Sequence, residues 1–164
     1  MNSTHKPNNY ITLDKGSKDG VKKDMGVISA TGIVGIIKNV NEDYSAVNSL
    51  LHRRTSISAK IKRTGAFGGV TWVGSNPRYV NLQAIPNHQT VKIGDTIVTS
   101  GYSAHFPPEL MIGVVDTTYL PSGSSFHHIE VLLSNDFSKL SYVEIIKNLK
   151  QTEQKALEKE VNDE

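Results

Sequence analysis

The chain has 164 residues, with 18 lysines and arginines against 16 aspartates and glutamates, and its formal net charge at pH 7 is +2. This near balance excludes a strong general attraction to polyanions such as nucleic acid. Because the sequence contains no cysteine, it also excludes disulfides, zinc–thiolate sites and thiol catalysis.

Strands dominate the predicted secondary structure. Thirteen glycines and many valine, isoleucine and threonine residues favour strands over helices. Apolar and polar residues alternate in 56–62 and 79–85, which predicts strands with one buried face, and we expect Trp72 and Phe67 in the core. The short spacing between segments favours antiparallel barrels or sandwiches over βαβ units. The eleven predicted strands are residues 10–13, 25–30, 33–40, 46–51, 56–62, 66–73, 79–85, 96–99, 110–117, 127–133 and 141–146.

One segment occurs twice. Residues 21–28 (VKKDMGVI) and 91–98 (VKIGDTIV) align at an offset of 70 residues. In both, a turn that begins with Val-Lys leads into a short β-branched strand, and a second strand containing glycine follows. The repeat predicts two similar β-domains within an all-β fold. We expect structural roles for residues of the second copy and its continuation, namely Gly94, Asp95 (accepting hydrogen bonds from backbone amides in its turn), Ser100, Gly101 and Gly113.

The pattern divides the chain into four parts. Residues 1–9 form a polar leading segment or linker, 10–85 a first barrel and 86–146 a second barrel. Whether the last strand returns to the first domain stays open, because either arrangement fits the spacing. Residues 147–164 contain four lysines and five acidic residues, which predicts a charged tail that is helical or disordered.

A secreted hydrolase of the chymotrypsin-like barrel class is one alternative. Ser100 precedes Gly101 at a strand end, and Asp95 and several histidines, among them His105, are available as partners. Nucleophilic catalysis also needs a base within hydrogen-bond reach and an oxyanion hole, and the sequence has no Gly-x-Ser-x-Gly motif. We therefore expect no catalytic residue, and we expect Ser100-Gly101 to begin a loop in which the glycine has a positive φ angle.

Metal, cofactor and nucleic-acid sites are not expected either. His127 and His128 are adjacent on a predicted strand, so their side chains leave from opposite faces and do not share a metal ion. The glycines around Gly68 precede a strand, whereas phosphate-binding loops precede a helix. A nucleic-acid-binding barrel is the second alternative, but the aromatic platform beside basic residues that it needs is weakly represented.

The loop that follows predicted strand 96–99 is the candidate interaction surface. Aromatic and proline residues on a loop held by rigid strands are typical of partner-binding knobs. A second interpretation is that Phe106 fills the barrel mouth while the prolines stiffen the return of the chain. Under the first interpretation, the residues that contact a partner are Tyr102, His105, Phe106 and Pro107.

Three blocks of the sequence carry a family resemblance, namely residues 11–28 with 32–35, residues 91–101 with 106–107 and 112–115, and residues 136–143. They resemble the rod shape-determining MreC family, in its extracytoplasmic β-domains. They occur in the family's order and cover most of the chain. The resemblance implies an all-β fold of two small, six-stranded-type β-barrels with short turns, similar to chymotrypsin-type barrels without the catalytic residues. The charged tail extends past this common core.

The resemblance also implies a function. It implies a non-enzymatic scaffold of the cell-wall elongation machinery that controls rod cell shape. The implied partners are the protein itself, as a homodimer or filament, and a class B penicillin-binding transpeptidase. Contact with the membrane and with actin-like shape proteins is expected through an N-terminal part outside this chain, and no nucleic acid is expected. We expect the chain on the periplasmic or extracytoplasmic side of the inner membrane, anchored by an N-terminal transmembrane helix that it does not contain.

Overall fold

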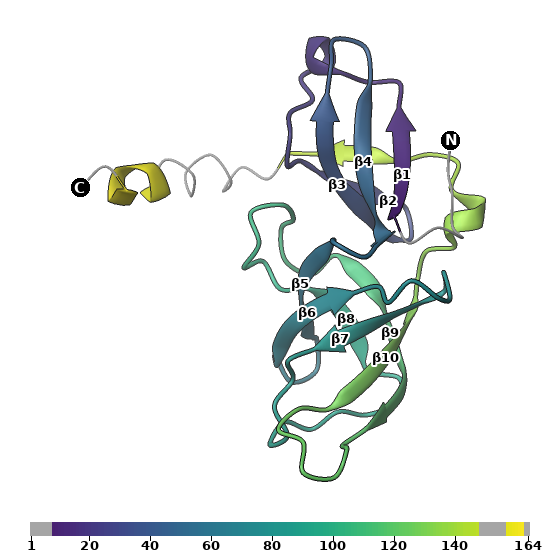
Figure 1. Cartoon of the computed structure of the whole chain (residues 1–164), viewed down its shortest axis with the longest axis vertical. Coiled ribbons are helices and arrows are strands. Elements are labelled where there is room, and N and C mark those ends of the chain that lie inside the picture. The colour runs from purple at the N-terminus through teal and green to yellow at the C-terminus, as the bar shows by residue number, and fades with distance from the viewer. Residues whose placement is uncertain (1–7, 148–156, 163–164) are drawn as a thin grey trace.

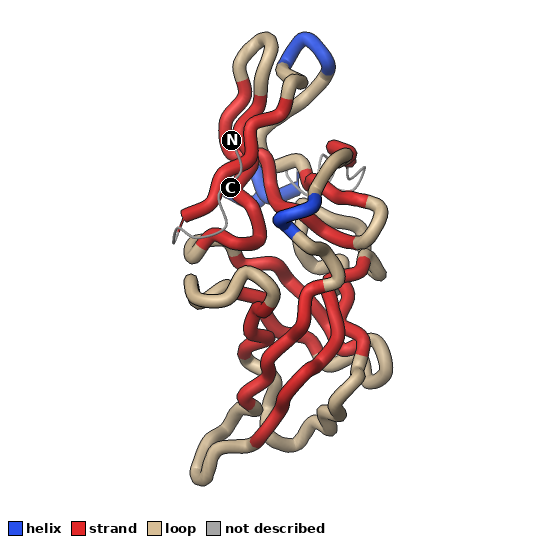
Figure 2. The backbone as a smooth tube through the Cα atoms, turned by 90° about the vertical axis from the view of Figure 1, so that its right-hand side faces the viewer, coloured by secondary structure: helices blue, strands red, loops and turns tan. Residues whose placement is uncertain are grey.

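The computed structural model describes residues 8–147 and 157–162, and nearly all regular structure in this part is β-strand (Figure 1). All eleven strands predicted from the sequence are present. Figure 2 shows the two strand-rich units stacked along the long axis of the molecule. The strands are β1 (Asn8–Leu13), β2 (Gly26–Ser29), β3 (Gly32–Val40), β4 (Ser45–His52), β5 (Ser56–Ile61), β6 (Phe67–Thr71), β7 (Tyr79–Gln83), β8 (Thr96–Thr99), β9 (Met111–Tyr119), β10 (His128–Leu133) and β11 (Glu144–Ile146).

The upper unit in Figure 1 is a five-stranded antiparallel sheet, which we call the N-terminal sheet. Its strand order is β1-β4-β3-β2-β11. A short 3-10 helix, η1 (Ser17–Asp19), lies between β1 and β2. The sequence predicts a six-stranded barrel here, but β1 and β11 are the two ends of the hydrogen-bonded order.

The lower unit is a closed barrel of six strands in the order β10-β7-β6-β5-β8-β9. The predicted alternation in β5 is confirmed, because Ile57, Ala59 and Ile61 are fully buried or nearly so. Val70 and Trp72 likewise face the interior. The predicted barrel architecture is therefore confirmed for this unit.

The boundary between the two units differs from the one expected near residues 85–87. Strands β5 to β7 precede that point in the chain, yet they belong to the barrel, because β5 pairs with β8 and β7 pairs with β10. The segment around residues 85–87 connects two strands of the barrel. The chain passes from the N-terminal sheet to the barrel between His52 and Ser56. After β10 the chain passes through η2 (Phe137–Lys139) and back to the N-terminal sheet, where β11 pairs with β2.

The internal repeat corresponds to the same backbone turn in both units. In the first copy, the N–H of Asp24 donates to the carbonyl of Ile37 over 2.9 Å, and in the second, the N–H of Gly94 donates to the carbonyl of Val115 over 2.8 Å. Both turn residues have a positive φ angle, +72° at Asp24 and +89° at Gly94. Glycine adopts this conformation without strain, whereas aspartate is one of the few other residues that tolerates it. Each turn leads into a strand that pairs with the strand after it.

A single hydrophobic core extends through both units, from Ile11 in β1 to Phe137 in η2. In the charged tail, residues 157–162 are helical, and the rest of the predicted tail between 148 and 164 lies outside the described residues. Within the described residues, no helix combines the length and the apolar character needed to cross a membrane.

Candidate partner-binding surface and the junction between the units

The loop between β8 and β9, residues 100–110, carries the four predicted partner-binding residues, and we call it the docking loop. Its two ends are held together at Thr99. The hydroxyl of Thr99 donates to the carbonyl of Pro107 over 2.7 Å and accepts the N–H of Leu110 over 2.9 Å. Pro107 itself is half-buried. Because both ends are tied to one buried side chain, the loop is a defined element of the barrel.

The hydrogen bonds of Ser100 are those of a residue that holds the loop in place. Its hydroxyl lies 2.8 Å from the hydroxyl of Ser58 and accepts the N–H of Tyr102 over 3.2 Å. Gly101 has a φ angle of +82°, as the sequence analysis predicts. Among the residues that the structure describes, no histidine ring is hydrogen-bonded to a serine hydroxyl. The candidate triad residues are therefore not brought together.

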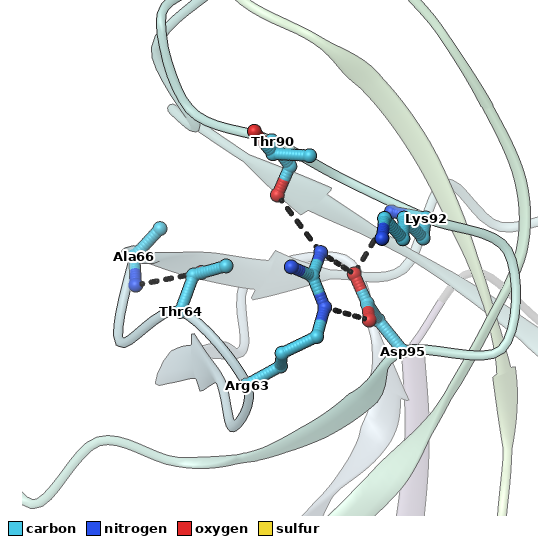
Figure 3. Close-up of polar contacts among 6 residues, drawn as sticks. All are labelled: Arg63, Thr64, Ala66, Thr90, Lys92 and Asp95. Atoms are coloured by element: carbon cyan, nitrogen blue, oxygen red, sulfur yellow. Dashed lines mark hydrogen bonds and ion pairs between the residues drawn. The ribbon is translucent and has the colours of Figure 1, made fainter.

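Asp95 closes the turn of the second repeat copy, because its carboxylate accepts several hydrogen bonds (Figure 3). Arg63 donates to its two oxygens over 2.7 and 2.9 Å, and the backbone N–H of Lys92 donates to Oδ2 over 2.8 Å. Arg63 also donates to the carbonyl of Thr90 over 3.3 Å. The hydrogen bond from Arg63 is the main reason that the pKa of Asp95 lies below its ordinary value. The expected hydrogen bond, from a backbone amide of the turn to the carboxylate of Asp95, is confirmed at Lys92.

Gly113, the last of the predicted structural residues, is buried in β9. It pairs with Ile97 of β8 on one side and with Leu133 of β10 on the other. Gly113 therefore lies on the middle strand of three neighbouring barrel strands.

Phe106 is only 1% exposed, so its expected place on a partner-binding surface is wrong. Its ring packs against β2 of the N-terminal sheet, where a Cβ atom on Gly26 would lie 2.6 Å from the ring carbon Cε1. A side chain larger than hydrogen at Gly26 would therefore push the two units apart. Beside it, Nδ1 of His105 lies 2.9 Å from the carbonyl oxygen of Asp24, in the turn that precedes β2. These two loop residues join the barrel to the N-terminal sheet.

Asn135 forms the second contact between the units, and the sequence analysis does not single it out. It is 2% exposed, and its side-chain amide donates to the carbonyl of Ile33 over 2.7 Å. Its Oδ1 accepts the hydroxyl of Ser29 over 2.6 Å and also the hydroxyl of Thr31. One buried amide from the segment after β10 therefore satisfies three groups of the β2–β3 hairpin.

Tyr102 remains exposed, with 69% of its surface accessible to solvent. It packs edge-on against Phe67 of β6, with ring centroids 5.0 Å apart and an angle of 62° between the planes. Phe67 is 58% exposed, so its expected place in the core is wrong. We call Tyr102 and Phe67 the aromatic pair. Lys60, which lies opposite Phe67 in the β5–β6 ladder, forms an ion pair of 2.5 Å with Glu109 of the docking loop.

The two adjacent histidines have different partners, as their predicted placement on a strand implies. Nε2 of His127 lies 2.8 Å from the carbonyl of Gln89, whereas the ring of His128 lies against Tyr119 with centroids 4.7 Å apart. No group of three or more potential metal ligands is present in the part of the chain that the structure describes.

The fold and these contacts define a class of protein: an all-β module of two docked units, with a closed barrel that presents an exposed aromatic pair. The family model for rod shape-determining protein MreC, barrel core, matches residues 1–147. The chain therefore belongs to the MreC family of cell shape-determining proteins.

Relatives with this description come from several bacteria. The chain is 31% identical over 112 residues to the cell shape-determining protein MreC of Listeria monocytogenes, an alignment that covers 66% of this chain and 38% of that protein. It is 25% identical over 138 residues to the MreC of Cereibacter sphaeroides, covering 84% of this chain and 43% of that protein. The chain thus spans about two fifths of the length of these curated relatives.

Solved structures share the fold. The Listeria MreC structure is similar with a TM-score of 0.80 and 28% identity, covering 90% of this chain and 71% of that chain. The crystal structure of MreC from Pseudomonas aeruginosa matches with a TM-score of 0.79 and 24% identity, covering 88% and 91% of the two chains. A complex between penicillin-binding protein PBP2 and MreC from Helicobacter pylori contains a chain that matches with a TM-score of 0.66 and 18% identity, covering 86% and 85%.

Proposed function

We propose that this chain is the extracytoplasmic scaffold region of a rod shape-determining protein, and that it holds a class B penicillin-binding transpeptidase within the cell-wall elongation machinery. Family membership supports the role in cell shape. The Helicobacter pylori relative forms a complex with PBP2, and another structural relative is described as the major periplasmic domain of the cell shape-determining filament MreC. These descriptions support a penicillin-binding protein as partner, self-association and a periplasmic location. A membrane anchor in a preceding part of the protein is a further element of the proposal.

The observation that carries the proposal for this chain is the exposed aromatic pair. Interface hot spots are enriched in tyrosine and other large aromatic residues. Tyr102 loses little conformational entropy on binding, because its loop is already tied at Thr99 and fixed to β2 through Phe106. Phe67 adds apolar surface beside it, and the Lys60–Glu109 ion pair borders the two rings. This composition, an aromatic centre with a charged rim, is typical of protein–protein interfaces.

The partner-binding residues expected from the sequence therefore divide into two groups. Tyr102 is proposed to contact the transpeptidase directly, together with Phe67. His105, Phe106 and Pro107 are proposed to act indirectly, by holding the docking loop in place. This division predicts different phenotypes for the two groups.

The test is the affinity of the chain for a purified class B penicillin-binding transpeptidase, measured by biolayer interferometry. We expect the double variant F67S/Y102S to bind at least about tenfold more weakly, as expected for loss of interface hot spots, while its melting temperature stays within a few degrees. The matched control is Tyr119→Ser, which removes another exposed tyrosine (58% accessible) from the barrel. Unchanged affinity of F67S/Y102S, with Y119S also unchanged, would remove the aromatic pair from the interface.

A scaffold role without catalysis is supported by the environment of Ser100, whose hydroxyl is bonded to Ser58. We expect Ser100→Ala to retain transpeptidase binding and cell shape when introduced into the full-length protein. A rounded-cell phenotype for S100A, with normal folding and binding, would favour the hydrolase alternative. Self-association is tested separately by light scattering over a range of concentrations, because a scaffold that forms filaments grows in mass with concentration.

A further inference from the structure

Positively charged side chains line a cleft between the two units, and the proposed function assigns them no role. The volume of the cleft is about 360 Å³. Its walls come from the turn before β2, from β3 and β4, from the β4–β5 connection and from the docking loop. The lining residues that matter for charge are Lys23, Lys38, Arg54, His105 and Asp24.

The side chains that line this cleft carry more positive than negative charge. Its lining contains three permanent cations, Lys23, Lys38 and Arg54, and one carboxylate, that of Asp24. Asp24 supplies the one carboxylate of the lining, so the three cations exceed it by two charges. Elsewhere in the barrel, partly exposed cations such as Arg63 and Lys60 are paired with carboxylates. The cleft therefore holds an excess of positive charge that a bound anion would neutralise.

The electrostatic field of these cations reaches a buried neighbour. His52 is 2% exposed, and its pKa is lowered first by burial and then by the charges of Lys38 and Arg54. Those two side chains, from different segments of the chain, thus act on the same region. Like charges held close together repel one another, and an oxyanion between them would offset this repulsion.

Hydrogen-bond donors are also available in the cleft. The amide of Asn48 lines it, and the Oδ1 atom of this side chain is buried without a hydrogen-bond partner. The NH2 group of an asparagine side chain is a hydrogen-bond donor. Ser56 adds an exposed hydroxyl. Arg54 offers a planar fork of donors that matches the geometry of a phosphate oxygen pair.

We propose that this interdomain cleft binds a phosphate group, as a phosphomonoester or phosphodiester, between Lys23, Lys38 and Arg54. Phosphate is favoured over a single carboxylate because it offers more acceptor oxygens and up to two negative charges to three cations. Because the lining comes from both units, an occupied cleft also ties the N-terminal sheet to the barrel. The phosphate comes either from a lipid headgroup or from a soluble or polymeric phosphodiester, and the experiment distinguishes these sources.

The test uses the histidine ring signals of the chain in NMR, titrated with inorganic phosphate and with glycerol 3-phosphate at constant ionic strength. We expect saturable shifts of His105 and His52, together with a rise in the pKa of His52 as the bound anion offsets Lys38 and Arg54. The variant K38Q/R54Q should bind phosphate at least about tenfold more weakly. The control K92Q/K139Q removes the same amount of charge from two exposed lysines outside the cleft, and it should bind like the unchanged chain.

The source of the phosphate follows from sedimentation with vesicles. Sedimentation with phosphatidylglycerol vesicles but not with phosphatidylcholine vesicles, lost in K38Q/R54Q and kept in K92Q/K139Q, assigns a lipid headgroup. Saturable binding of glycerol 3-phosphate without such sedimentation assigns a soluble or polymeric source. The proposal is overturned if phosphate produces no saturable shift, if acetate at the same ionic strength produces an equal one, or if K38Q/R54Q binds as tightly as K92Q/K139Q. The readout contains no transpeptidase, so its result is independent of the proposed function.

Discussion

The two copies of the repeated turn have the same backbone and different surroundings. In the barrel copy, the N–H of Lys92 donates to the carboxylate of Asp95 over 2.8 Å, and Arg63 neutralises that carboxylate. In the copy of the N-terminal sheet, the N–H of Lys22 donates instead to the sulfur of Met25 over 3.3 Å. A thioether is a weak acceptor and a charged carboxylate is a strong one. The barrel turn is therefore closed by its own side chains, whereas the other turn is supported by the contacts that it makes across the junction.

The largest expected effect of any single change falls on that junction. Phe106→Ala removes the ring that fills the space above Gly26, and we expect it to lower the free energy of unfolding by about 3–5 kcal/mol. Urea denaturation measures this loss. Phe106→Leu keeps most of the apolar volume and should lose much less. Equal stability of F106A and the unchanged chain would show that the loop does not hold the two units together.

How far the sequence predicts the fold depends on the range of the interactions. The strands follow from alternation and turn residues, which are local, and the repeat correctly identifies two equivalent turns. The position of the domain boundary depends on the pairing of β5 with β8, between residues about 40 apart in the chain. A pattern break near residue 86 looks the same whether it separates domains or strands of one barrel, so the sequence alone misplaces it.

Asn135 comes next in expected effect. Asn135→Ala leaves the carbonyl of Ile33 without the buried amide that donates to it and removes one acceptor of the Ser29 hydroxyl. This should cost about 1–3 kcal/mol in the free energy of unfolding. As a control, Asn39→Ala changes an exposed asparagine of β3 and should stay within about 0.5 kcal/mol. Similar losses for the two variants in chemical denaturation would contradict a special role of Asn135.

Asp95→Asn tests the barrel turn, with a smaller expected loss of about 1 kcal/mol because the side chain of Arg63 is 40% exposed and its ion pair is partly screened by solvent. The pKa of Asp95 is lowered from an ordinary value of 3.8, chiefly by the hydrogen bond from Arg63. Its contribution is therefore fully present above pH 3.8 and is lost as the pH falls through the lower pKa of the folded state. The stability difference between the unchanged chain and D95N should shrink in acid. A constant difference from pH 7 down to strongly acidic pH would show that charge is not the cause.

The smallest expected effect concerns His52 and the pH range near neutrality. Burial, with Lys38 and Arg54, lowers the pKa of His52 from 6.5, so the unfolded chain takes up a proton more readily than the folded chain. Stability from this residue is present above pH 6.5 and falls as the pH drops through that value. His52→Asn retains an acceptor for the N–H of Arg54 and removes the titration. Thermal melting from pH 8 to 5 should show a smaller loss for H52N than for the unchanged chain, and equal slopes would contradict the lowered pKa.

The candidate site was predictable in part. The exposure of Phe67 could have been predicted from the alternation of side chains along a strand. Val70 and Trp72 face the barrel interior, and a residue three positions before Val70 lies on the opposite face. Phe106 and Tyr102 belong to one loop with no periodicity, and only the position of β2 decides which of them is covered. The role of Asn135 depends equally on a contact across about 100 residues. Residues of this kind are recognised only once the two units are placed side by side.

The most direct test of the central claim is hydrogen–deuterium exchange of the chain with and without a class B penicillin-binding transpeptidase. The claim is that the barrel presents the aromatic pair while the junction holds its loop in place. We therefore predict that binding slows exchange of the backbone amides at residues 66–69 and 101–104, and that the amides around Gly26 exchange slowly with or without the partner. Protection confined to the N-terminal sheet, with residues 66–69 and 101–104 unchanged, would contradict the account.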